Sequence, residues 1–208
     1  MAESVKICEA LDEISWFMPP LICSDVPSLD QELYQFKVGV QHSNKPLILS
    51  ASNVDTIKKI IDLAAIISGS KDALNERPTF TIAIGLMSPL LITSDLCDIS
   101  IACAKSGIPV FLYTQAMAGT TSPVTLSGTL AGSHAETLAA TTLIKLVNPD
   151  AKIIYNNFSQ PFDIKTSDLS FGNPEFGLLM ATVTQLGKYI NLPSGTGMFA
   201  TDSPLSDM

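Results

Sequence analysis

Short apolar runs alternate along the chain with longer stretches in which apolar residues recur at helical spacing. Six segments predict buried strands, of which all but the last are continuous apolar runs. They are residues 15–19, 46–50, 80–85, 109–113, 152–156 and 195–199. The segments at 80–85 and 152–156 are rich in Ile, Thr and Tyr, as strands tend to be.

Between these runs the pattern predicts helices. They cover residues 5–11, 54–67, 94–105, 123–147 and 174–190. Asn53 is a candidate N-cap, and Gly69 and Gly107 are candidate C-terminal stops. For the long fourth helix we expect Ser122 as N-cap and Pro123 as first helical residue. Its many small residues predict close packing on a sheet.

Strand, helix and strand in regular succession indicate parallel strands joined by crossovers. No Gly-x-Gly-x-x-Gly follows the first strand, so a dinucleotide-binding sheet is disfavoured. A complete barrel has eight strands and takes ~250 residues, whereas this chain has 208 residues. We therefore expect an α/β fold, an incomplete TIM-type (β/α) barrel of about six strands, with residues 1–208 as one partial domain.

Composition excludes several classes of protein. Hydrophobic residues make up 46% of the chain and charged residues 15%, which suits a sheet buried on both faces. No apolar run reaches the ~18 residues of a membrane span and no signal peptide is visible, so we expect a cytoplasmic protein. The net charge of −8 argues against nucleic acid. The four cysteines lack metal-ligand spacing, and with two histidines a metal site is not expected.

In a parallel barrel the chemistry lies in the loops at the carboxyl ends of the strands. Here those loops are polar, and Asp25 and Asp202 are their charged residues. From this placement we expect substrate contacts from a small set of side chains. They are Gln115, Met117, Tyr155, Asn156 and Asp202. No set of catalytic residues can be assigned, and we interpret His134, Glu136, Asp30 and Glu32 as structural or solvated residues.

Two features of these loops favour particular ligands. Aromatic residues lie at or near strand ends, and their faces suit a tertiary or quaternary ammonium group, although filling of the barrel interior is the stronger explanation for any single ring. They are Phe17, Tyr113, Tyr155, Phe158 and Phe199. The segment 118–122 leads into the expected helix, where free N–H groups bind anions such as phosphate, unless Ser122 simply caps the helix.

One long block resembles a known family. Residues 113–130 contain Met117-Ala118-Gly119, then Pro123, Thr125-Leu126 and Gly128, similar to the signature loop and helix of the trimethylamine methyltransferase family. Shorter similarities stand in the same order along the chain. They are residues 24–27, 32–36, 88–90, 135–139, 171–175 and 201–203. After residue 203 the chain departs from the family pattern, with Pro204-Leu205-Ser206-Asp207 where we expect Lys and then Pro-Asp.

The resemblance implies a TIM-barrel methyltransferase that moves a methyl group from a methylated amine to the cobalt of a separate corrinoid (cobalamin) protein. Co(I) attacks an N-methyl carbon and the amine leaves. Some members carry pyrrolysine and use trimethylamine, and others lack it and use glycine betaine. The resemblance also implies a truncated member, a cognate corrinoid protein and a small methylated amine as partners, no directly bound cofactor and a homo-oligomer.

Two alternatives remain open at this point. One is a non-catalytic barrel fragment that associates with a full-length homologue or with the corrinoid partner. The other is a different TIM-barrel enzyme that binds a phosphorylated small molecule through the helix after Ser122.

Overall fold

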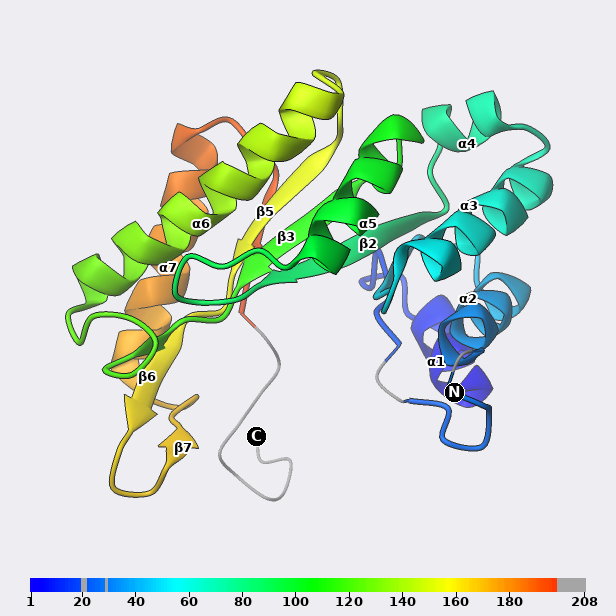
Figure 1. Cartoon of the computed structure of the whole chain (residues 1–208). Coiled ribbons are helices and arrows are strands. Elements are labelled where there is room, and N and C mark those ends of the chain that lie inside the picture. Colours follow the sequence, from blue (N-terminus) through cyan, green and yellow to red (C-terminus); the bar gives the residue numbers. More distant parts are fainter. Residues whose placement is uncertain (20–21, 29, 198–208) are drawn as a thin grey trace. The chain divides into compact units, whose positions relative to one another are not determined.

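The computed structural model describes residues 1–19, 22–28 and 30–197 (Figure 1). Its elements follow one another as α1 (Ala2–Ala10), α2 (Gln31–His42), β1 (Leu47–Leu49), α3 (Val54–Ser68), α4 (Lys71–Glu76), β2 (Phe80–Leu86), α5 (Ser94–Lys105), β3 (Val110–Thr114), β4 (Met117–Ala118), α6 (Leu126–Val147), β5 (Ile153–Asn157), β6 (Gln160–Asp163), β7 (Asp168–Leu169), α7 (Pro174–Tyr189) and β8 (Ser194–Thr196). Helices and strands alternate along most of the chain, which confirms the α/β class.

Five strands form one sheet in the order β1-β2-β3-β5-β8. Strand β1 pairs in parallel with β2, with Leu47 opposite Phe80, and β5 pairs in parallel with β8. Each step along this sheet is connected through at least one helix. Such an arrangement is compatible with part of a (β/α) barrel. A second, small sheet has the order β4-β6-β7, in which β4 and β6 are parallel and β6 and β7 antiparallel.

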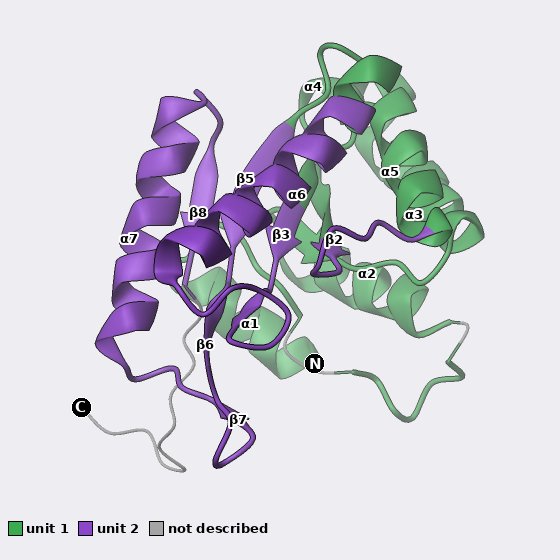
Figure 2. Ribbon diagram, turned by 60° about the vertical axis from the view of Figure 1, so that its left-hand side comes forward, with its two compact units in different colours: residues 1–84, 94–111, 144–152 green, residues 85–93, 112–143, 153–208 purple. Residues whose placement is uncertain are grey.

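The chain divides into two compact units (Figure 2). Unit 1 comprises residues 1–84, 94–111 and 144–152, and unit 2 comprises residues 85–93, 112–143 and 153–208. The boundaries pass through β2 and β3, so unit 2 holds the carboxyl ends of both strands. The loops that follow β2, β3 and β5 therefore begin within unit 2.

In unit 1 the clearest helix follows the sequence signals closely. The Asn53 side chain accepts a hydrogen bond from the Thr56 N–H at 2.9 Å, and Gly69 ends α3 in the left-handed region with φ of 89°. Ile57, Ile60 and Ala64 of this helix are fully buried. These observations confirm the predicted cap and stop of the helix at 54–67, whereas Ile67 at its end is exposed.

Unit 2 is built around β5, with α6 and α7 packed beside it (Figure 1). The Asn173 side chain accepts a hydrogen bond from the Phe176 N–H at 2.8 Å, and Pro174 opens α7. Leu179 and Val183 of α7 are buried. The buried face of α6 is unusual because it is largely polar, with Thr129, Ser133 and Thr137 fully buried.

Two sequence-based expectations are wrong in detail. Residues 15–19 form no strand, since only Phe17 makes a parallel bridge to Leu47, and Pro19 has no N–H with which to extend a ladder. Helix α6 begins at Leu126 instead of Pro123. The Thr125 hydroxyl accepts from the Gly128 N–H at 3.3 Å and acts as the cap that we expected of Ser122.

Helices α2 and α4 were not predicted. Helix α4 has only 6 residues, too few for a periodic pattern. Helix α2 contains Gly39, a poor helix former, and Val38 and Val40 beside it favour strands. Gly39 is needed because an added Cβ would meet the Leu47 side chain of β1. Close packing on the sheet therefore outweighs helix propensity at this position.

Candidate functional site

The carboxyl end of β5 carries a group of fully buried polar side chains. Asn156, Asn157, Ser159 and Gln160 all have no exposed surface. Burial of an amide costs several kcal/mol without hydrogen bonds, so these residues need partners. Asn157 and Ser159 find partners in α6 and in the segment after β3. Among the described residues, the side-chain amide of Gln160 and Oδ1 of Asn156 have none.

Asn157 connects helix α6 to the turn after β5. Its side-chain N–H donates to the Ser133 hydroxyl at 2.6 Å, and its side-chain carbonyl accepts from the Ser159 N–H at 2.7 Å. The Ser159 hydroxyl in turn accepts from the Ala116 N–H at 3.1 Å. A continuous chain of hydrogen bonds thus runs from α6 to the segment that holds Gln115 and Met117.

The same segment is also fixed by its backbone. The Gln160 N–H donates to the Ala116 carbonyl at 3.0 Å, and the Phe158 N–H donates to the Thr114 carbonyl at 2.8 Å. These bonds place residues 114–117 beside residues 158–160 in unit 2. These bonds join the ends of β3 and β5, and we call residues 113–117 and 156–160 the strand-end surface.

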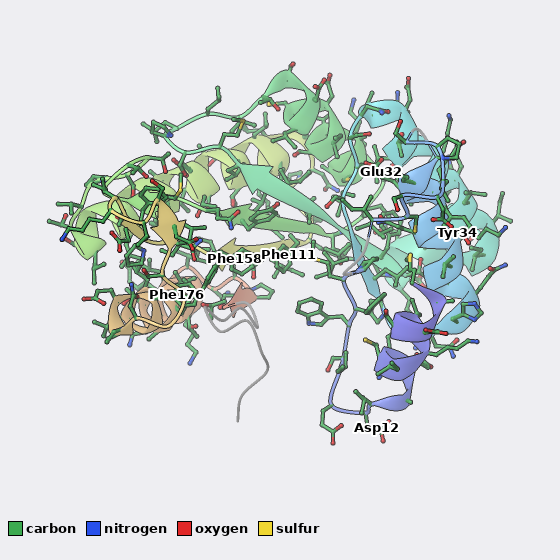
Figure 3. The ribbon with its side chains drawn as sticks, turned by 90° about the horizontal axis from the view of Figure 1, so that it is seen from below. Asp12, Glu32, Tyr34, Phe111, Phe158 and Phe176 are labelled. Atoms are coloured by element: carbon green, nitrogen blue, oxygen red, sulfur yellow. The ribbon has the colours of Figure 1, made fainter. Side chains whose placement is uncertain are left out.

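On this surface two aromatic rings lie together. The ring centroids of Tyr113 and Phe158 are 5.6 Å apart, with an angle of 44° between the ring planes. Both residues are half-buried (Figure 3 labels Phe158). Burial raises the pKa of the Tyr113 hydroxyl, which therefore stays protonated at neutral pH.

A glycine in β2 makes room for Tyr113. A Cβ added at Gly85 would lie 2.7 Å from the Tyr113 hydroxyl oxygen and 2.8 Å from its ring carbon Cζ. Any larger residue at position 85 would displace the ring. Gly85 of β2 therefore leaves the space that the Tyr113 ring occupies.

The structure describes four of the five predicted substrate contacts, and their surroundings differ. Gln115 is exposed and Met117 is half-buried, both in the strand-end segment described above. Asn156 is buried, and its side-chain N–H donates to the carbonyls of Leu112 and Ile154. Asp202 lies outside the described residues, as does Phe199.

Tyr155 is buried against helix α6. It has no exposed surface, and its hydroxyl lies 3.0 Å from Nδ1 of His134 on α6. Burial raises the pKa of Tyr155 to about 12 and lowers the pKa of His134. Because side chains alternate along a strand, Tyr155 and Asn157 contact α6 while Asn156 lies on the opposite face. A ligand on the Asn156 face would not reach Tyr155.

Glu136 shapes the loop after β2. Its carboxylate is only 5% exposed and accepts from the Ser88 hydroxyl and from the Leu90 N–H, both at 2.8 Å. The loop closes on itself through paired hydrogen bonds between Met87 and Leu91. Glu136 is therefore a buried structural carboxylate, one of the two roles we expected for it.

Three N–H groups of the loop at 118–122 donate to carbonyls of residues 117–122. The N–H groups of Thr120 and Ser122 both donate to the Met117 carbonyl at 3.1 Å, and the Gly119 N–H donates to the Ser122 carbonyl. The helix begins at Leu126, beyond this loop. The expected anion site therefore differs from the prediction, since the helix starts three residues later than expected and these three N–H groups are already used.

Other classes of site find no support in the described part of the chain. Within residues 1–19, 22–28 and 30–197, no three His, Cys, Asp or Glu side chains gather closely enough to hold a metal ion. The four cysteines are free, and burial raises the pKa of Cys103 to about 12. None of the described helices combines the length and apolar character that a membrane span requires.

Comparison with known proteins shows which family the chain belongs to. All 208 residues match the family model described as trimethylamine methyltransferase (MTTB). The chain belongs to the trimethylamine methyltransferase family. The segment 113–130, on which the resemblance depends most, supplies Tyr113, the loop after β3 and the start of α6.

Curated members of the family are similar along most or all of the chain. Trimethylamine methyltransferase MttB of Desulfitobacterium hafniense (strain DSM 10664 / DCB-2) is 30% identical over 207 residues, which cover 100% of this chain and 42% of that protein. Trimethylamine methyltransferase MttB1 of Methanosarcina mazei is also 30% identical, over 217 residues with the same coverage. The glycine betaine methyltransferase of Desulfitobacterium hafniense (strain Y51) is 31% identical over 183 residues, 88% of this chain and 38% of that protein. The chain thus spans about two fifths of the length of these relatives.

Glu32, which we interpreted as a structural or solvated residue, is half-buried in the structure. It lies in the first turn of α2 (Figure 3 labels it) and lines a cavity at the carboxyl end of β1. Without a predicted helix at 31–42, nothing in the sequence relates Glu32 to that strand end. Only the fold brings the two together within unit 1.

Proposed function

We propose that this chain forms part of a methyltransferase that moves a methyl group from a methylated tertiary or quaternary amine to the cobalt of a corrinoid protein. The observation that carries the proposal is the match of the whole chain to the trimethylamine methyltransferase family. Relatives named for trimethylamine and for glycine betaine are equally similar to it. In this proposal residues 1–208 form one part of a TIM-type barrel.

The pair of half-buried aromatic residues Tyr113 and Phe158 supports an ammonium substrate. A methylated ammonium group has no or few N–H donors, so hydrogen bonds recognise it poorly, whereas the negative face of an aromatic ring attracts it. Each such contact is worth ~0.5–2 kcal/mol. We expect Gln115 and Met117, on either side of the hydrogen-bonded Ala116, to contact the rest of the amine.

The ring pair acts on binding more than on the chemical step. When the N-methyl carbon passes to cobalt, the C–N bond breaks and its electron pair stays on nitrogen. The positive charge that the rings attract is therefore lost as the reaction proceeds, and the rings hold the substrate more tightly than the neutral amine product. The cobalt of the partner protein supplies the nucleophile, and the residues of this chain orient the methyl group towards it.

The phosphate-binding alternative loses its main support. It depended on free N–H groups at 118–122, and three of those groups, in Gly119, Thr120 and Ser122, are used within the loop. No basic side chain belongs to that loop. We therefore favour an amine over a phosphorylated compound.

The proposal predicts that a methylated amine stabilises the folded chain. At a concentration ten times Kd, trimethylammonium or glycine betaine should raise Tm by about 3–6 °C for a domain of this size. Differential scanning calorimetry with and without each amine measures the shift. Phe158→Leu, which removes one ring and keeps an apolar side chain, should reduce the shift, whereas Phe176→Leu in α7 should not. An unchanged Tm with both amines would contradict the proposal.

A further inference from the structure

Unit 1 has a surface hollow of about 410 Å³ that is lined by helices α2 and α3 (Figure 1 labels both helices). Its apolar lining includes Leu33, Tyr34 and Val40 of α2 and Leu63 and Ile67 of α3. Leu63 is 42% exposed and Ile67 is 55% exposed, although leucine and isoleucine are usually buried. A group of exposed apolar side chains beside a hollow is typical of a surface that binds another protein.

Among the described residues that line this hollow, Asp30 and Lys37 carry the charge. The Asp30 carbonyl accepts a hydrogen bond from the Tyr34 N–H at 2.9 Å, so Asp30 continues the first turn of α2. Residues 30 and 37 are two helical turns apart, so they lie on one stripe of α2, about 10 Å apart along its axis. The ion pair that described residues form joins Lys71 and Asp62, so neither Asp30 nor Lys37 has an ion-pair partner among them.

The order of these two charges fits a second copy of the same helix. A second α2 in parallel orientation would place like charges opposite each other, Asp30 against Asp30 and Lys37 against Lys37. An antiparallel α2, related by a two-fold axis between Leu33 and Tyr34, places each Asp30 opposite Lys37 of the other copy. Leu33 and Tyr34 of the two copies then meet at the axis, with one charge pair on each side of it.

We propose that α2 and α3 form the interface of a two-fold symmetric homodimer, in which α2 packs antiparallel against α2 of the second copy. Tyr34 of each copy (Figure 3 labels it) enters the hollow of the other, which Leu63 and Ile67 border. Burial of these apolar side chains supplies most of the attraction. The two pairs of Asp30 with Lys37 select the antiparallel orientation.

The charge pairs also answer a repulsion between the copies. The chain has a net charge of −8, so two copies repel each other unless a surface offers local attraction. The resemblance to the family implies a homo-oligomer without naming a surface, and the inference assigns one from the charges and the apolar lining of the hollow. It does not depend on methyl transfer or on any amine, so its failure leaves the proposed function untouched.

Sedimentation equilibrium of the purified chain tests the inference. The unaltered chain should reach the mass of two copies, each of 22.2 kDa. Asp30→Lys and Lys37→Asp each place like charges opposite one another twice, so each should weaken the dimer by about tenfold or more. Asp12→Lys and Lys165→Asp change the net charge by the same amounts at exposed positions outside the hollow and should leave the association as it is.

A mixture of the two single variants gives the sharpest test. In a heterodimer of Asp30→Lys with Lys37→Asp, opposite charges meet at both contacts, so the mixture should form dimers at a concentration where each variant alone is a monomer. This recovery also shows that both variants are folded, and circular dichroism of each variant checks it independently. A monomeric unaltered chain, single variants that associate as the unaltered chain does, or folded single variants whose mixture stays monomeric would each overturn the inference.

Discussion

Replacing Asn157 by alanine should lower the free energy of unfolding by about 2–4 kcal/mol. Asn157 has no exposed surface, and its side chain makes two short hydrogen bonds, to Ser133 and to the Ser159 N–H. Alanine leaves the Ser159 N–H buried without its partner and opens a cavity beside α6. An unpaired buried donor costs about 1–3 kcal/mol, and lost packing adds to it.

Urea denaturation of Asn157→Ala measures this loss. Asn44→Ala is the control, because its side chain makes a long hydrogen bond of 3.4 Å to Glu9 at the surface, and it should cost less than about 1 kcal/mol. Hydrogen exchange gives a local readout, since the amides of Ser159 and Ala116 should exchange faster in Asn157→Ala. Equal free energies for the two variants would show that the chain of hydrogen bonds from α6 does not hold the strand-end surface.

Replacing Gly195 by alanine should destabilise unit 2 by about 1–3 kcal/mol. Gly195 of β8 is the partner of Asn156 in β5, and an added Cβ would overlap Oδ1 of Asn156. Asn156 is fully buried, and its N–H group is hydrogen-bonded to the Leu112 and Ile154 carbonyls. The side chain therefore cannot turn away from residue 195 without losing these bonds.

The matched control is Gly177→Ala in α7, where an added Cβ meets nothing within 4 Å. It should be neutral or stabilise the helix by up to about 1 kcal/mol. Combining Gly195→Ala with Asn156→Ala restores the space, so the double variant should be more stable than the sum of the two single changes predicts. Strict additivity would mean that the two side chains do not compete for the same volume.

Several helices and strands were predictable because the local preferences of their residues agree with the way these segments pack in the fold. Residues 80–86 and 153–157 are short segments that include several β-branched residues, and both are strands. Asn53 and Gly69 mark the two ends of a strongly periodic helix. Where these signals disagree the prediction failed, as at Gly39, whose small size serves the contact with Leu47 and not the helix.

The candidate site was predictable only as a set of positions at strand ends. Tyr155 and Asn156 are adjacent in β5, so their side chains point to opposite faces of the sheet. The sequence does not tell which of these faces contacts α6. The contact of Tyr155 with His134 depends on the register of α6 against β5. Phe158 was expected as an aromatic residue near a strand end, but its pairing with Tyr113 required the fold.

The central claim is that the chain takes part in methyl transfer from an amine to cobalt. The most direct measurement follows the Co(I) absorbance of a reduced corrinoid protein after addition of the purified chain with trimethylammonium or glycine betaine. The account predicts that the Co(I) signal falls only when both the chain and one of these amines are present, and that Phe158→Leu slows the change about 3- to 30-fold at low amine concentration. A Co(I) signal that stays constant with each amine would contradict the account.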